Sequence, residues 1–234
     1  MESEWLSFAQ GPLFRLSLLV MILGLGRLLV LSLAGMLQAY RRAGNKAFDP
    51  LRIARATAGG LLPSFRPGAV RWFLSTGSLI FHLGLILVPL FLHGHIRLWE
   101  KGIGLAWRSL PGVWADALSF GVIGAGLGLL GGRIFYLPSR SISRQQDFLL
   151  PLLILAVFIS GLLAAHPPWN PFSYSSTLLV HVLAGDLLLM LMPCSKLSHA
   201  VLWPFRHLAT ELAWRFPPDA GPKILATLGK EDKV

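Results

Sequence analysis

Long runs of apolar residues, separated by short charged segments, dominate the chain. Each run has the roughly 18 or more residues that a helix needs to cross a hydrocarbon core about 30 Å thick. Lipid-exposed backbone must satisfy its own hydrogen bonds, and a closed barrel would need short alternating strands instead. We therefore expect an all-α, integral membrane five-helix bundle. The runs cover approximately residues 14–38, 74–98, 113–132, 148–165 and 177–194.

Basic residues gather in alternate segments between these runs. The segment after the first run contains one acidic residue, Asp49, against seven basic ones: Arg41, Arg42, Lys46, Arg52, Arg55, Arg66 and Arg71. The next segment on the same side and the tail add Arg133, Arg140, Arg144, Lys196, Arg206, Arg215, Lys223, Lys230 and Lys233. Short loops rich in Lys and Arg stay in the cytoplasm. The N-terminus is therefore predicted outside and the C-terminus in the cytoplasm, in a multi-pass protein of the cell inner membrane.

Composition agrees with a bilayer location. The chain is 54% hydrophobic and 14% charged, whereas soluble domains carry about 25% charged residues. The net charge is +10. The basic residues that produce it lie between the apolar runs and not along one soluble face, so we expect no nucleic-acid partner. The single Cys194 excludes a disulfide framework, a four-cysteine iron–sulfur cluster and a Cys-x-x-Cys-His haem attachment. We expect a membrane domain at 1–203 and a cytoplasmic tail at 204–234, with a short helix around 206–214.

Four histidines in or beside the apolar runs carry the candidate chemistry, because ionisable side chains in lipid normally face a cofactor, a cavity or a partner. His82 and His95 are 13 residues apart on the second run, about 20 Å along a helix. His181 and His199 are 18 residues apart, about five whole turns, which predicts one shared helical face. Antiparallel helices would bring His82 level with His199 and His95 level with His181.

Such pairs predict two b-type haems, each held by one imidazole from each helix, and so a transmembrane electron path. Straight-helix geometry favours His93 over His95 as the second ligand on its run, because His93 lies only about 20° around the helix from His82. Pro89 can kink or rotate that helix, which leaves the choice open. Two other classes also remain open: a histidine-lined transporter of a metal or small solute, and a structural anchor without a cofactor.

Four segments resemble a known family. They are Phe81-His-Leu-Gly84, Gly94-His-Ile-Arg-Leu-Trp99, His181-Val-Leu-Ala-Gly-Asp186 and Pro193-Cys-Ser-Lys-Leu-Ser-His199. These segments resemble the gamma subunits of respiratory nitrate reductase and, more closely, the cytochrome b subunits of sulfite-reductase-associated and high-molecular-weight cytochrome membrane complexes.

That resemblance implies a five-helix protein with two haems b. His82 and His199 would hold the cytoplasmic haem, and His95 and His181 the outer one, so the resemblance favours His95 over His93. It also implies a quinone, menaquinone in many bacterial relatives, near the outer haem, and an iron–sulfur or other redox subunit on the cytoplasmic face. The expected function is a quinone-reactive electron-transfer subunit of a quinol-dependent oxidoreductase complex.

Several other polar residues are candidates for the same chemistry. His166 ends the fourth run and suits proton transfer from a quinol, although capping that helix explains it equally well. Arg97 and Lys101 can face a quinone headgroup or haem propionates, or they anchor the helix at the interface.

Three further residues extend this set. Arg27 and Arg133 are candidate propionate partners, and Asp186 can orient a ligand or relay a proton. Snorkelling or a hydrogen bond inside the bundle competes for Arg27, interface anchoring for Arg133 and a hydrogen bond to a neighbouring helix for Asp186. The third run contains glycines that we interpret as helix-packing positions: Gly121, Gly124, Gly126, Gly128, Gly131 and Gly132.

Overall fold

The computed structural model describes residues 2–44, 49–61, 69–213 and 218–229, and within these ranges the chain is helical and contains no strand. Short π and 3-10 turns join several of the helices. The α-helices are α1 Glu2–Phe8, α2 Phe14–Arg42, α3 Pro50–Leu61, α4 Ala69–Phe91, α5 His93–Ile103, α6 Gly112–Phe135, α7 Leu137–Ser141, α8 Gln145–Ala165, α9 Tyr174–Leu191, α10 His199–Leu202, α11 Arg206–Ala213 and α12 Ala220–Thr227.

Among the residues that the structure describes, five helical segments are long and apolar enough to cross a membrane, which confirms the five-helix prediction. They are Glu4–Arg42, Trp72–Phe91, Gly112–Phe135, Gln145–Ala165 and Tyr174–Cys194. The first begins ten residues earlier than expected because a π-helical turn, Ala9–Leu13, carries the chain through Pro12 without ending the helix. Proline lacks the N–H of an ordinary helical residue, and a local π turn accommodates that loss.

The described residues divide into two compact units. The first comprises those within 1–23 and 63–197, and the second those within 24–62 and 198–234. The boundary predicted after residue 203 falls inside the second unit and stays a prediction.

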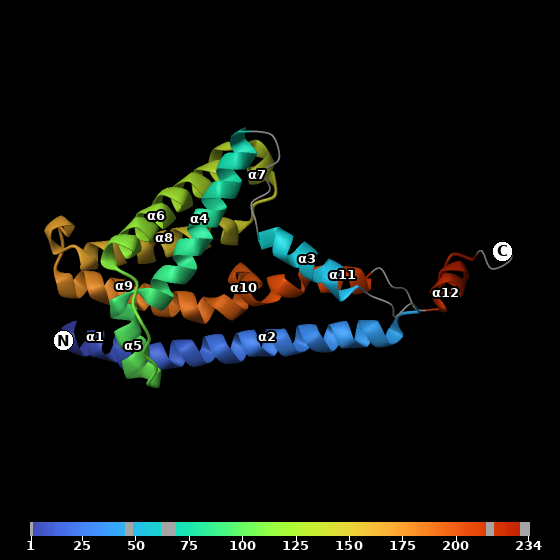
Figure 1. Cartoon of the computed structure of the whole chain (residues 1–234), viewed down its shortest axis with the longest axis horizontal. Helices are drawn as coiled ribbons and strands as arrows, with labels where there is room; N and C mark the ends of the chain where they lie inside the picture. The colour runs from blue at the N-terminus through green and yellow to red at the C-terminus, as the bar shows by residue number, and fades with distance from the viewer. Residues whose placement is uncertain (1, 45–48, 62–68, 214–217, 230–234) are drawn as a thin grey trace. The chain divides into compact units, whose positions relative to one another are not determined.

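Close contact between α4 and α6 builds the centre of the first unit, where the two helices run antiparallel (Figure 1). A Cβ on Gly84 of α4 would lie 2.3 Å from Val122 Cγ2 and 3.0 Å from the carbonyl oxygen of Leu118 on α6. Only glycine fits that approach. The buried side chains around it form one core: Phe81, Val88, Val122, Ile154 and Phe158.

The six glycines of α6 that were predicted to pack against other helices fall into two groups. A Cβ on any of the first group would lie 3.0 Å or less from a side chain of a neighbouring helix, whereas nothing lies within 4 Å of the second. The packing interpretation therefore holds for the first group alone. The first group is Gly121, Gly126, Gly128 and Gly132; the second is Gly124 and Gly131.

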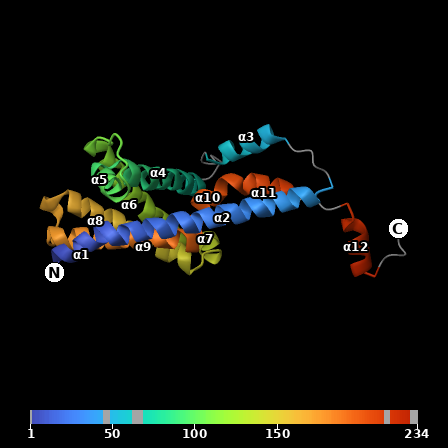
Figure 2. The same cartoon turned by 90° about the horizontal axis from the view of Figure 1, so that it is seen from below.

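The pair α8 and α9 completes the first unit, and α1 lies against α9 (Figure 2). Large apolar side chains elsewhere face outward; on α2, for example, Leu23 is 63% exposed and Val30 64%. In water such surface would favour aggregation, whereas hydrocarbon solvates it. The exposed apolar surface and the helix lengths together indicate a multi-pass protein in a lipid bilayer.

In the second unit, α3 and α11 contact one another through an ion pair of 2.6 Å between Arg52 Nη2 and Glu211 Oε1. The short helix predicted at 206–214 is α11, which ends at Ala213, whereas α3 was not predicted because its twelve residues are too short and too mixed to read as a span. Immediately before α12, the carboxyl of Asp219 accepts a hydrogen bond from Lys223, which lowers the pKa of that carboxyl. Some residues of the predicted basic loops, tail and short helix lie outside the described ranges. They are Lys46, Arg66, Trp214, Arg215, Lys230 and Lys233.

Candidate functional site

Two imidazoles from different helices face one another in the first unit. His95 Nε2 of α5 lies 3.5 Å from His181 Nε2 of α9, and the two ring planes are within 8° of parallel. The ring centroids are 5.8 Å apart, much farther than the nitrogen atoms. The rings therefore meet edge to edge through their Nε2 atoms and are not stacked face on face.

In each ring, Nδ1 is hydrogen-bonded to a backbone carbonyl oxygen. The His181 Nδ1–H donates to the carbonyl oxygen of Val157 at 2.9 Å, and the His95 Nδ1–H donates to that of Val88 at 3.2 Å. We assign the proton to Nδ1 in each ring because a carbonyl oxygen only accepts. Each Nε2 then carries a lone pair, and two lone pairs directed at one another cannot form a hydrogen bond. An electron-pair acceptor between the nitrogens, such as a proton or a metal ion, would satisfy both lone pairs.

A break in the second span places His95, and not His93, at this position. Helix α4 ends at Phe91, Leu92 adopts an extended conformation (φ −70°, ψ 132°), and α5 restarts at His93. Straight-helix geometry therefore does not apply across the break, which comes three residues after Pro89. His93 is exposed, whereas the ring of His95 is partly buried against His181.

The loop that follows α5 satisfies the carbonyl groups left at the end of α4. The backbone N–H of Leu110 donates to the Phe91 carbonyl, and Trp107 Nε1 donates to that of Leu90, both at 2.8 Å. A helix end without such partners is costly. These bonds therefore stabilise the break.

Helix α8 supplies the other wall of the histidine pair. A Cβ on Gly161 would lie 2.7 Å from His181 Cε1 and 3.0 Å from His181 Nδ1. The neighbouring Ser160 is buried, with its Oγ 3.4 Å from His181 Nδ1. The sequence analysis did not identify either residue. The signal that could have found them is a Ser-Gly pair within a run of otherwise large apolar side chains.

The two remaining predicted ligands lie in different units. His82 of α4 is exposed, and its Nδ1–H donates to the carbonyl oxygen of Ser78 at 2.7 Å. His199 is the first residue of α10 and is also exposed. The prediction that one continuous helix carries His181 and His199 on one face is wrong. Helix α9 ends at Leu191, and Ser195 is fully extended (φ −132°, ψ −178°) after the turn that contains Pro193.

His166, predicted near a quinone, forms a hydrogen bond with a residue that the sequence did not single out for chemistry. His166 Nε2 lies 3.1 Å from Asp116 Oδ1 at the start of α6. The ring stacks on Trp169 with centroids 4.3 Å apart. Arg97 and Lys101, the other two quinone candidates, are exposed on α5.

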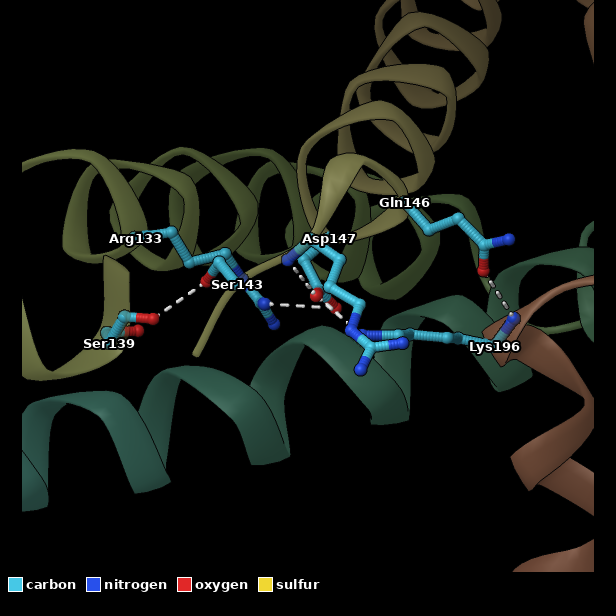
Figure 3. A network of polar contacts seen from close by, with 7 residues as sticks. Arg133, Ser139, Ser143, Gln146, Asp147 and Lys196 are labelled. Carbon is cyan, nitrogen blue, oxygen red and sulfur yellow. Dashed lines mark hydrogen bonds and ion pairs between the residues drawn. The ribbon is translucent and has the colours of Figure 1, made fainter. Parts of the chain in front are cut away.

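Arg133 pairs with Asp147, at the opposite end of α6 (Figure 3). Asp147 Oδ1 is 3.3 Å from Arg133 Nη1, and Asp147 Oδ2 accepts from Lys196 Nζ and, at 2.8 Å, from the backbone N–H of Arg144. Ser143 Oγ donates to the Ser139 carbonyl, and the Lys196 N–H donates to Gln146 Oε1. The carboxylate therefore links the end of α6, the start of α8 and the 3-10 turn Lys196–Ser198 that follows α9.

Asp186 and Arg27 occupy contrasting environments. Asp186 is 3% exposed on α9, beside Ser17, and its Oδ2 atom is buried without a hydrogen-bond partner among the described residues. It follows His181 by five residues, which is about 7.5 Å along a helix. Arg27 is exposed on α2 in the second unit.

Comparison with known proteins identifies a relative of this chain. No family model and no solved structure matches the chain. A protein of Nitratidesulfovibrio vulgaris strain Hildenborough is 30% identical over 202 residues, which cover 84% of this chain and 88% of that protein. The chain belongs to the family of that protein. The relative's description names no activity, so an argument about function depends on the site.

Proposed function

We propose that the chain is a quinone-reactive b-type cytochrome subunit of the inner membrane, which transfers electrons through two haems between the menaquinone pool and a partner redox subunit. The observation that carries the proposal is the His95–His181 pair, with both Nδ1 atoms bonded to carbonyls and both Nε2 atoms directed at one another. A metal held between two such nitrogens receives a lone pair from each.

The pair suits a haem iron better than a bare metal ion. His95 and His181 would hold such an iron through their Nε2 atoms, which lie 3.5 Å apart. Within the described part of the chain, no three His, Cys, Asp or Glu residues gather as ligands. A zinc ion takes three or four protein ligands, whereas a porphyrin supplies four nitrogens itself. A haem with two imidazole ligands supplies one-electron transfer without an open coordination position.

His82 and His199 are proposed to hold the second haem. The bond from His82 Nδ1 to the Ser78 carbonyl is the same kind of anchor that fixes His95 and His181, and it directs Nε2 away from its own helix. An imidazole fixed in this tautomer presents Nε2 as the donor atom, as metal-ligating histidines commonly do.

The basic loops favour an N-terminus outside and a C-terminus in the cytoplasm. In that orientation His95, His181 and His166 lie toward the outer face, where Arg97 and Lys101 would attract a quinone headgroup. The Arg133–Asp147–Lys196 cluster lies toward the cytoplasm, where an iron–sulfur or other redox subunit is proposed to dock. Quinol oxidation outside with electron flow inward would separate charge across the membrane.

A visible spectrum tests the proposal. Purified protein is expected to show a reducible b-type signal with two haems per chain, and protein without such a signal would refute it. The ligand choice is tested by paired substitutions: His95→Ala is expected to lower the haem content to about one per chain, whereas His93→Ala leaves it near two. The opposite result would overturn the assignment of His95.

A further inference from the structure

Three side chains from three elements meet where α6 begins and α8 ends. Asp116 stands in the first turns of α6, His166 is the residue at which α8 ends, and Trp169 closes the 3-10 turn that follows. The His166 ring stacks on Trp169 at 23°, and Phe120 adds a second ring 6.2 Å from Trp169. The result is an imidazole between a carboxylate and an aromatic surface.

The contact with Asp116 decides which nitrogen of His166 can accept a proton. The carboxylate accepts a hydrogen bond from the Nε2–H at 3.1 Å, and this tautomer leaves a lone pair on Nδ1. When Nδ1 takes up a proton, the negative charge of Asp116 stabilises the imidazolium that forms. A carboxylate orients and supports a catalytic histidine in the same way in hydrolytic triads.

The cluster is accessible to a ligand that travels in the membrane. The side chains of His166 and Asp116 are 27% and 40% exposed, and Trp169 and Phe120 are 56% and 50% exposed. Both α6 and α8 are membrane-length helices, so the cluster lies at the end of a span, at the depth of the interface. A ligand with a flat, hydroxylated ring and an apolar tail matches both the polar groups and the aromatic rings of this cluster.

We propose that Asp116, His166 and Trp169 form the site at which a quinol is bound and gives up its protons. This inference rests on the proposed function. The quinol ring stacks near Trp169, and one hydroxyl donates to His166 Nδ1. Conversion of one quinol to one quinone breaks two O–H bonds and releases two electrons, which a haem held by His95 and His181 would accept one at a time. The first proton goes to His166 Nδ1 and then to water outside, and the second follows the same route.

Rapid mixing with a short-tailed naphthoquinol tests the assignment in the purified holoprotein. The measured quantity is the rate of haem reduction by quinol divided by the rate with dithionite, which reports proton-coupled transfer separately from haem integrity. Asp116→Asn and His166→Gln are each expected to lower this ratio at least about 100-fold, since a positioned base contributes 10²–10⁴-fold. The double variant is expected to be little slower than the slower single variant, because the two groups act as one unit.

Matched controls separate the inference from the proposed function. His93→Gln and Asp219→Asn change an exposed histidine and an exposed carboxylate elsewhere and are expected to leave the ratio unchanged. Normal ratios in Asp116→Asn and His166→Gln, with both haems present, would overturn the inference and leave the cytochrome assignment intact. Absence of a haem spectrum in the wild type would refute the proposed function itself.

Binding provides a readout without turnover. Titration with the oxidised naphthoquinone is expected to quench tryptophan fluorescence, and Trp169→Phe is expected to remove most of the saturable quenching. Trp72→Phe removes another exposed indole and serves as the control. Equal quenching in the two variants would overturn the placement of the ring at Trp169.

Discussion

Gly161→Ala tests whether α8 positions the imidazole of His181. The new Cβ would lie 2.7 Å from His181 Cε1, whereas ordinary van der Waals contact begins at 3.4 Å, so the ring has to retreat by about 0.7 Å. A retreat of that size away from α8 stretches the 2.9 Å bond from His181 Nδ1 to the Val157 carbonyl beyond hydrogen-bonding distance.

The two effects set the magnitude. Overpacking costs about 1–3 kcal/mol, and a lost hydrogen bond about 0.5–1.5 kcal/mol. Together they weaken haem binding by about 1.5–4.5 kcal/mol, which corresponds to about 10- to 1,600-fold in haem affinity at 1.4 kcal/mol per factor of ten. The expected result is selective loss of the haem assigned to His95 and His181, measured as haem transfer to an excess of apomyoglobin.

Gly185→Ala is the matched control on the same helix as His181. Nothing lies within 4 Å of a Cβ at Gly185, so alanine is expected to stabilise α9 by about 0.5–1 kcal/mol through its helix propensity and to leave haem transfer unchanged. If Gly161→Ala transfers haem at the wild-type rate, with unchanged spectra of both haems, the positioning role assigned to α8 is wrong.

Two further predictions concern packing and the charged cluster. Gly84→Ala is expected to lower the free energy of unfolding in mixed detergent micelles by about 1–3 kcal/mol, because its Cβ would lie 2.3 Å from Val122, whereas Gly77→Ala on the same helix, with nothing within 4 Å, should lower it little or not at all. Asp147→Ala removes the bond to the first turn of α8 and both ion pairs, and a loss of about 1–2 kcal/mol is expected by the same assay. Asp147→Asn keeps an oxygen for the cap, so it should cost about half as much; equal losses in the two variants would show that the cap contributes nothing and that the ion pairs account for the whole effect.

The sequence predicted the helices that cross the membrane better than their ends. A run of about 20 apolar residues is a local property, and its length in lipid decides that it spans. The ends depend on other parts of the chain. The span that begins at Glu4 continues through Pro12, and the second span stops at Phe91 because the loop residues Trp107 and Leu110 satisfy its last carbonyls.

The predictions of haem ligands from ideal helix geometry depended on whether each helix is continuous. The 18-residue interval between His181 and His199 predicts one face only if the helix is unbroken, and it ends at Leu191. The geometric preference for His93 over His95 depended in the same way on a straight helix through Leu92. The family resemblance, which favours His95, did not depend on helix angles.

The sequence by itself determined that the chain is an all-helical membrane protein with histidines at costly positions, because hydrophobic length and the cost of burying imidazole are properties of residues and their neighbours in the chain. Only the tertiary structure decided which atoms meet. The opposed Nε2 atoms of His95 and His181, the close approach of Gly161 and the Asp116–His166 contact each join helices far apart in sequence. Such contacts depend on where a helix breaks and how closely its neighbour packs, which no periodicity along one helix encodes.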